Sequence, residues 1–129
     1  MTPKRKRIWD KTGGKCWYCG NDLPEKGWHA DHVEPVIRVT ELARKNPDCP
    51  DQAWKPERER EDNKVPACSK CNLYKSTHSV EEFRELLQRQ VELARKASVN
   101  FRNAERFGLI TVNGVKVTFY FETMESSHG

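Results

Sequence analysis

The stretches Cys16-Trp17-Tyr18-Cys19 and Cys68-Ser69-Lys70-Cys71 each hold two cysteines separated by two residues. Four thiolates at this spacing are the ligand set of a tetrahedral structural zinc site. Two disulfides, or thiols packed in a core, are the alternatives. We expect no secretory signal, because the basic N-terminus lacks an apolar segment. Disulfides are then less favoured than metal binding, which the CxxC spacing suits.

A long insertion separates the two cysteine pairs. It covers residues 20–67 and is therefore more than twice as long as the roughly 15–20 residues between the pairs of a compact zinc ribbon. Asp31-His32 lies inside the insertion, and Asn72 directly follows Cys71. A single zinc would also draw these three side chains together. A carboxylate, an imidazole and an amide oxygen could then form a second site, for a hard divalent cation.

Further residues extend this pattern at fixed positions around the cysteines. The full set is Cys16, Cys19, Ala30, Asp31, His32, Val33, Pro35, Asp62, Asn63, Val65, Pro66, Cys68, Cys71, Asn72 and Lys75. In this combination residues 5–85 resemble the HNH nucleases, also called ββα-metal or His-Me finger nucleases. The resemblance implies an α+β fold with a small ββα-metal finger and a metal-dependent endonuclease that hydrolyses phosphodiester bonds in DNA.

The resemblance also implies a role for each residue of the second site. His32 would be the general base, since a neutral imidazole can take a proton from water near pH 7. We expect a backbone carbonyl of the opposite strand to orient its ring. Asn63 would brace the loop, and Asp31 and Asn72 would hold the catalytic cation. Asn72 stands where many members have histidine, and its amide oxygen favours Mg²⁺ or Mn²⁺, which leaves zinc to the cysteines.

Composition indicates one domain of 129 residues with a thin core, because 36% of the residues are hydrophobic and 33% are charged. A zinc ion would then supply much of the stability. There is no apolar run of 18 residues, so we expect no membrane span. We expect a cytoplasmic monomer or homodimer that binds DNA; by resemblance, its setting is a bacterial or phage-infected cell.

Basic residues gather at the N-terminus, where residues 1–15 contain one acidic residue, Asp10. The basic ones are Lys4, Arg5, Lys6, Arg7, Lys11 and Lys15. Such a cluster is either the solvated face of a helix or a phosphate-binding surface. As nucleic-acid contacts we expect Lys4, Arg5, Lys70 and Lys75.

Local patterns predict most of the secondary structure. Thr2-Pro3 predicts a helix start, with the helix running to about Lys11. Strands are expected over residues 28–33 and 63–71, with a strand end, bulge or bend that re-aims Asp31 or His32 toward one site. A helix should begin at Asn72. A short helix or turn fits residues 36–46, and Cys49 reads as an incidental loop thiol. The alternating charges of residues 57–62 read as solvated surface, although this loop could instead cover the site and touch substrate through Arg58 or Arg60.

The C-terminal part carries two further signals. A capping box, Ser79 with Glu82, opens an amphipathic helix that should run to about Ala97. Asn113-Gly114 lies between two alternating apolar runs and predicts a β-hairpin over residues 109–121. The hairpin could complete the core, pair with a second subunit or help seat DNA. Residues 1–97 would thus form the nuclease domain, and residues 98–129 a helical turn, hairpin and tail packed on it.

Two other function classes fit parts of the sequence. A zinc-stapled module that binds nucleic acid without cleaving it would need the four cysteines, but not Asp31, His32 and Asn72 together. A redox protein would use the CxxC thiols, but it should show a βαβ pattern around one pair, and none is present.

Overall fold

The computed structural model describes residues 1–35 and 59–126. Within these ranges the chain forms six α-helices, one 3-10 helix and a two-stranded antiparallel sheet, which confirms the α+β class. The predicted element at residues 36–46 and Cys49 lie outside the described residues. No helix in the described ranges is long and apolar enough to cross a membrane.

Helix α1, Pro3–Trp9, begins as the sequence predicts. Thr2 is its N-cap, where the side-chain oxygen accepts a hydrogen bond from the Arg5 amide at 3.2 Å, and Pro3 occupies the first turn. Both features favour a helix start because the first N–H groups of a helix have no partner within it. The helix ends at Trp9, two residues before the predicted end, and it buries Ile8.

The centre of the molecule is a strand–strand–helix unit. Strand β1, His29–His32, pairs antiparallel with β2, Lys64–Ala67, so that Asp31 lies opposite Val65. The 3-10 helix η3, Glu61–Asn63, leads into β2. Helix α3, Ser69–Lys75, follows β2 almost at once. It starts three residues earlier than predicted, because the Cys68 sulfur acts as its N-cap by accepting a hydrogen bond from the Cys71 amide.

An aromatic cluster joins this unit to α4, Val80–Gln88. The rings of Tyr18 and Phe83 meet edge to face at 5.4 Å between centroids, and Phe119 stacks on Phe83 at 5.5 Å. All three side chains are almost completely buried. Ser79 and Glu82 form the predicted capping box at the start of α4. The core therefore contains residues from the first cysteine pair, α4 and the C-terminal segment.

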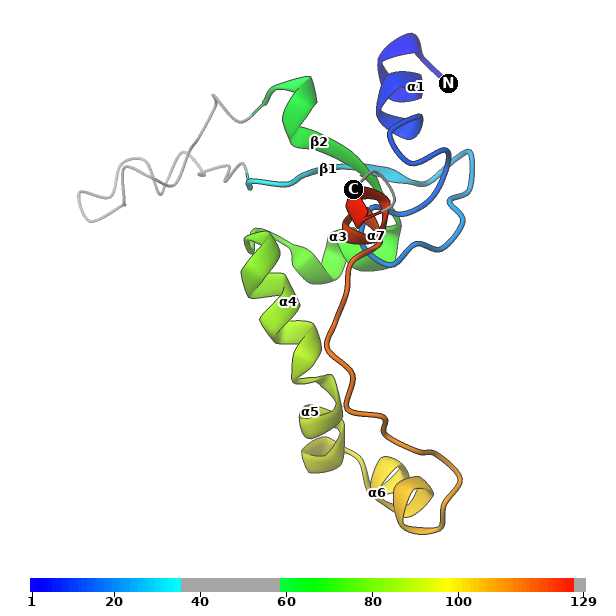
Figure 1. Cartoon of the computed structure of the whole chain (residues 1–129), viewed down its shortest axis with the longest axis vertical. Helices are drawn as coiled ribbons and strands as arrows, with labels where there is room; N and C mark the ends of the chain where they lie inside the picture. The colour runs from blue at the N-terminus through cyan, green and yellow to red at the C-terminus, as the bar shows by residue number, and fades with distance from the viewer. Residues whose placement is uncertain (36–58, 127–129) are drawn as a thin grey trace, which may run out of the picture.

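The long helix predicted over residues 79–97 is instead two helices. Helix α4 ends at Gln88, and α5 covers Gln90–Ala97. The side-chain amide of Gln90 donates to the Leu86 carbonyl at 3.0 Å, which is the acceptor that the backbone amide of Gln90 would use in a continuous α-helix. Helix α6, Val99–Arg106, then forms under a Ser98 cap. In Figure 1, α5 and α6 extend away from the strand–strand–helix unit.

The predicted C-terminal β-hairpin is wrong. Residues 109–119 contain no strand, and Tyr120–Ser126 form helix α7. Side chains of α4 form hydrogen bonds with the backbone groups that the partner strand of the hairpin would have paired. The Gln88 side chain bonds the Val115 carbonyl at 3.1 Å and the Val117 amide at 2.8 Å, and Arg84 bonds the Val117 carbonyl. Figure 1 shows this segment running back past α5 and α4 to the centre of the molecule.

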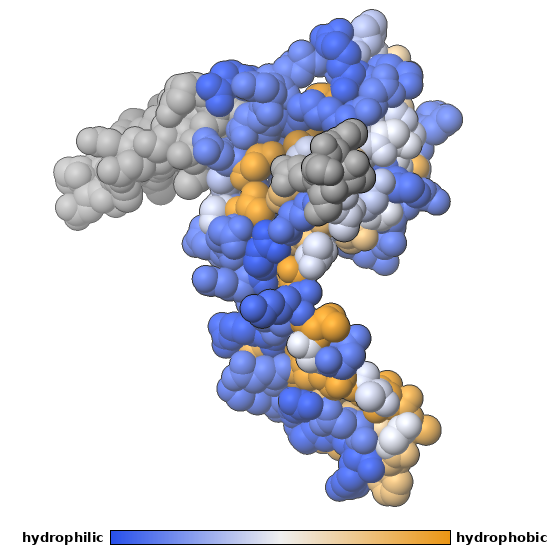
Figure 2. All heavy atoms as spheres, in the orientation of Figure 1, coloured by the Kyte–Doolittle hydropathy of each residue, from blue (hydrophilic) through white to orange (hydrophobic). Residues whose placement is uncertain are grey.

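The α5–α6 end of the molecule carries several exposed apolar side chains. They are Val99, Phe107, Leu109, Ile110, Val112 and Val115. Figure 2 shows apolar atoms over this lower part, next to a polar surface. The buried core lies elsewhere, around the cysteines and α4.

We predict that Phe83→Ala lowers the free energy of unfolding by about 3–5 kcal/mol, because it leaves a cavity at the centre of the aromatic cluster. Phe107→Ala is the matched control, since Phe107 is 73% exposed and Phe83 only 1%. It should change stability by less than about 0.5 kcal/mol. Urea unfolding of the zinc-loaded protein measures both, and equal losses would contradict this placement of the core.

Candidate metal centre and active site

The four predicted cysteines lie together. The sulfurs of Cys16, Cys19, Cys68 and Cys71 are all within 4.8 Å of one another, and all four thiols are free. Two come from the turn after α1, Cys68 caps α3, and Cys71 lies in its first turn. The sequence prediction that these residues form one cluster is confirmed. The cluster can hold a metal ion such as zinc.

The electrostatics of the cluster also fit a cation. A hydrogen bond from Cys71 lowers the pKa of Cys16 to about 4. That same bond raises the pKa of Cys71, and burial raises the pKa of Cys19 to about 11. Four thiols at this distance cannot all ionise alone, because each thiolate repels the next. A bound dication removes that conflict, and the amide of Cys68, 3.4 Å from the Cys16 sulfur, already favours a thiolate there.

Asp31 is buried next to the cysteine cluster. Its Oδ2 accepts a hydrogen bond from the Tyr18 hydroxyl at 2.6 Å and lies 3.3 Å from the Lys75 ammonium. Burial raises the pKa of Asp31, and Lys75 opposes that rise. Burial also raises the pKa of Tyr18, so that its hydroxyl stays protonated and donates. Asp31 is therefore connected directly to the turn that carries the first cysteine pair.

Lys75 contradicts one sequence prediction. We expected it to contact a phosphate, but its side chain is fully buried. Its ammonium donates to the His32 carbonyl at 2.9 Å. Because α3 begins at Ser69, Lys75 falls in its last turn and faces β1. In this structure the residue stabilises the end of β1 and has no surface for a phosphate.

His32 lies on a different side of β1 from Asp31. Its Nε2 is 3.2 Å from Oε2 of Glu59, and the same oxygen is 3.3 Å from the Lys64 ammonium. Of the three expected features, a bulge does not occur in β1 and the strand ends at His32. The pairing stays regular up to that residue, so the alternation of a strand keeps the two side chains apart. The partner of the ring is a carboxylate and not the expected backbone carbonyl. The sequence missed Glu59 because it lies among alternating charges that read as solvated surface.

Asn63 binds the two residues that directly follow β1. Its side chain accepts from the Glu34 amide and donates to the Glu34 carbonyl, each at 2.9 Å. Its own carbonyl accepts from the Val33 amide at 2.9 Å. Asn63 is buried, and these bonds fix the chain directly after His32. The geometry is that of a bracing residue.

Two oxygens that could bind a hard cation have no partner among the residues that the structure describes. Within residues 1–35 and 59–126, neither Oδ1 of Asp31 nor the side-chain amide of Asn72 makes a hydrogen bond. Asn72 is half-buried on α3, three residues before Lys75. Lys75 contacts Asp31, so this face of α3 is turned toward β1. The two groups are the donor types that Mg²⁺ and Mn²⁺ take.

Most of the N-terminal basic residues bind other parts of the protein. The Arg5 guanidinium donates to the Trp28 carbonyl and lies 3.8 Å from the centre of its ring. Arg7 pairs with Glu61, and the Lys11 ammonium donates to the carbonyls of Glu61 and Lys64. Lys6 and Lys15 pair with Asp10 and Asp22. Of the expected nucleic-acid contacts, Lys4 and Lys70 are exposed and form no ion pair in the described ranges.

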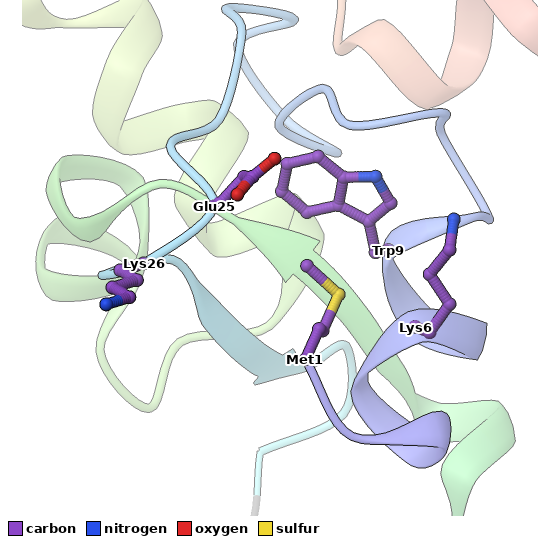
Figure 3. Close-up of a pocket in the computed structure, with 5 residues that line it drawn as sticks. All are labelled: Met1, Lys6, Trp9, Glu25 and Lys26. Atoms are coloured by element: carbon purple, nitrogen blue, oxygen red, sulfur yellow. The ribbon is translucent and has the colours of Figure 1, made fainter.

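A surface pocket of about 290 Å³ lies between α1 and the turn before β1. Figure 3 shows its lining, with the Trp9 indole between Glu25 and the side chains of Met1 and Lys6. None of the candidate residues lines it. The candidate site is built from hydrogen bonds and ion pairs around the end of β1 and shares no residue with this pocket.

Comparison of the chain with protein-family models, curated proteins and solved structures finds no match.

We predict that the purified protein binds about one zinc ion per chain and that Cys71→Ser loses it and unfolds at a lower temperature. The three remaining thiolates leave the fourth tetrahedral position to water, which weakens zinc binding. Elemental analysis and thermal unfolding measure the two effects. Cys49→Ser is the matched control and should keep its zinc. Full zinc in Cys71→Ser would contradict a single four-cysteine site.

Proposed function

We propose that this protein is a metal-dependent endonuclease of the HNH type that hydrolyses phosphodiester bonds in DNA. One observation carries the proposal. Asp31 and His32 end a strand whose partner strand leads directly into the helix that carries Asn72, and the four-cysteine cluster joins the start of that helix to the turn before the first strand. The strand–strand–helix order and the resemblance of residues 5–85 to HNH nucleases support the finer fold assignment, a ββα-metal finger.

In this proposal His32 removes a proton from the attacking water. Its ring is held by Glu59 at 3.2 Å, and its backbone by Lys75 at 2.9 Å. A base held at both ends keeps one orientation toward the substrate. Asn63 holds the backbone of Glu34, two residues after His32. The His32 side chain is only half-buried, so part of it is open to solvent.

Asp31 and Asn72 would hold the divalent cation. The fit is chemical: one carboxylate oxygen and one amide without partners in the described ranges suit Mg²⁺ or Mn²⁺, which keep several waters. When bound, such an ion neutralises the charge of the scissile phosphate and stabilises the leaving oxygen. Lys4 and Lys70 are exposed and are the proposed phosphate contacts outside the centre.

A second function is favoured by the burial of Asp31. A carboxylate that is 5% exposed and paired with a lysine already serves a structural purpose. A zinc-stapled module that binds nucleic acid without cleaving it would keep this pair. Such a module would show binding that weakens steeply with salt, and no strand breaks with any metal.

We predict that the zinc-loaded protein nicks or cuts supercoiled DNA with Mg²⁺ or Mn²⁺, and that His32→Ala lowers the rate by about 10²–10⁴-fold while zinc stays bound. The loss follows from removal of the base. Gel assays of supercoiled, linear and branched DNA, with elemental analysis of the same samples, measure both quantities.

His29→Ala is the matched control, because His29 lies on the same strand and is exposed. It should cleave as fast as the unchanged protein. Equal rates for His32→Ala and the unchanged protein would remove His32 as the base. Binding without cleavage under every metal condition would leave the binding module as the function.

A further inference from the structure

Three polar side chains are buried together between the cysteine cluster and the end of β1. Lys75 is 0% exposed, Tyr18 2% and Asp31 5%. A lysine ammonium is expensive to bury and is kept inside a protein only where hydrogen bonds and an opposite charge offset the loss of water. In a protein with so thin a core, this group calls for an explanation beyond stability.

The contacts show what the group holds in place. The Lys75 ammonium binds the His32 carbonyl at 2.9 Å and lies 3.3 Å from Oδ2 of Asp31. The Tyr18 hydroxyl donates to that same Oδ2 at 2.6 Å. The two contacts occupy one carboxylate oxygen and fix the carboxylate plane. Within the described part of the chain, Oδ1 is the oxygen of Asp31 that stays without a partner.

We propose that Lys75 and Tyr18 are positioning residues of the nuclease centre, which present Oδ1 of Asp31 to the catalytic cation and hold His32 through its backbone. The inference rests on the proposed function. It connects the metal-binding turn to the chemistry, because Tyr18 lies between Cys16 and Cys19. It also predicts that Lys75 weakens cation binding and favours the chemical step.

The two effects have opposite signs. The Lys75 ammonium repels a dication bound to the adjacent carboxylate, so removing it should tighten cation binding. Removing it also frees the His32 carbonyl, which should slow the chemical step. Loss of the charge would by itself tighten cation binding, so the slower chemical step at saturating cation is the effect that identifies a positioning residue.

The test compares Lys75→Met with Lys116→Met in zinc-loaded, full-length protein. Lys116 is exposed, so both variants lose one positive charge, but only one loses the buried contact. Electron paramagnetic resonance of free Mn²⁺ measures binding without DNA, and single-turnover cleavage at saturating Mn²⁺ measures the chemical step. For Lys75→Met we expect Mn²⁺ to bind about ten-fold tighter and cleavage to slow by about ten-fold or more.

Tyr18→Phe separates charge from hydrogen bonding. It removes the donor to Oδ2 but keeps the ring in the aromatic cluster and leaves the ammonium in place. We expect unchanged zinc content, no tightening of Mn²⁺ binding, and cleavage slower by about ten-fold. If Lys75→Met folds too weakly for assay, its unfolding temperature should still rise more steeply with Mn²⁺ than that of the unchanged protein, because the dication replaces the buried charge.

The outcomes distinguish this inference from the function on which it rests. Cleavage by the unchanged protein, with Mn²⁺ affinity and rate unaltered in Lys75→Met, would overturn the inference and leave the nuclease. Tyr18→Phe cleaving at the full rate would overturn the role of Tyr18. Mn²⁺ bound without any cleavage would overturn the function, and no Mn²⁺ binding by the unchanged protein would overturn both.

Discussion

The four sulfurs join parts of the chain that are far apart in sequence, and the rest of the structure depends on that junction. The turn with Cys16 and Cys19 meets the start of α3 at Cys68 and Cys71, with all sulfurs within 4.8 Å. The strands between them have four residues each, and a two-stranded sheet of that size is marginal in water. A metal in the cluster would hold the sheet against α3 and so set the position of every candidate residue on β1.

Local sequence signals proved reliable where a few neighbouring residues decide the structure. Thr2 and Pro3 start α1, Ser79 and Glu82 start α4, and the two CxxC pairs form one cluster. The hairpin prediction failed although its turn signal was strong. Gly114 does have a positive φ of 67°, but Gln88 and Arg84 occupy the backbone groups of the following residues. Tertiary contacts of this kind cannot be deduced from the alternation of apolar residues.

Charged residues of the candidate site were the hardest to predict. The sequence shows that Lys75 follows Asn72 by three residues, but not that its ammonium turns inward to His32 and Asp31. Glu59 belongs to a run of alternating charge, and only its contact with His32 distinguishes it. Arg5, Arg7 and Lys11 look like a phosphate-binding surface in sequence, yet they bind Trp28, Glu61 and Lys64. In each case the partner is distant in sequence.

The buried pair explains how one strand can serve two purposes. Because successive side chains of β1 point to opposite faces, Asp31 reaches the cysteine turn while His32 reaches Glu59. Lys75 contacts both residues, one through its carboxylate and the other through its carbonyl. Lys75 can therefore fix the position of Asp31 relative to His32, although the two side chains point to opposite faces of the strand. Burying a lysine at this place lowers stability. That loss is understandable if the proposed chemistry needs Asp31 and His32 in a fixed relative position.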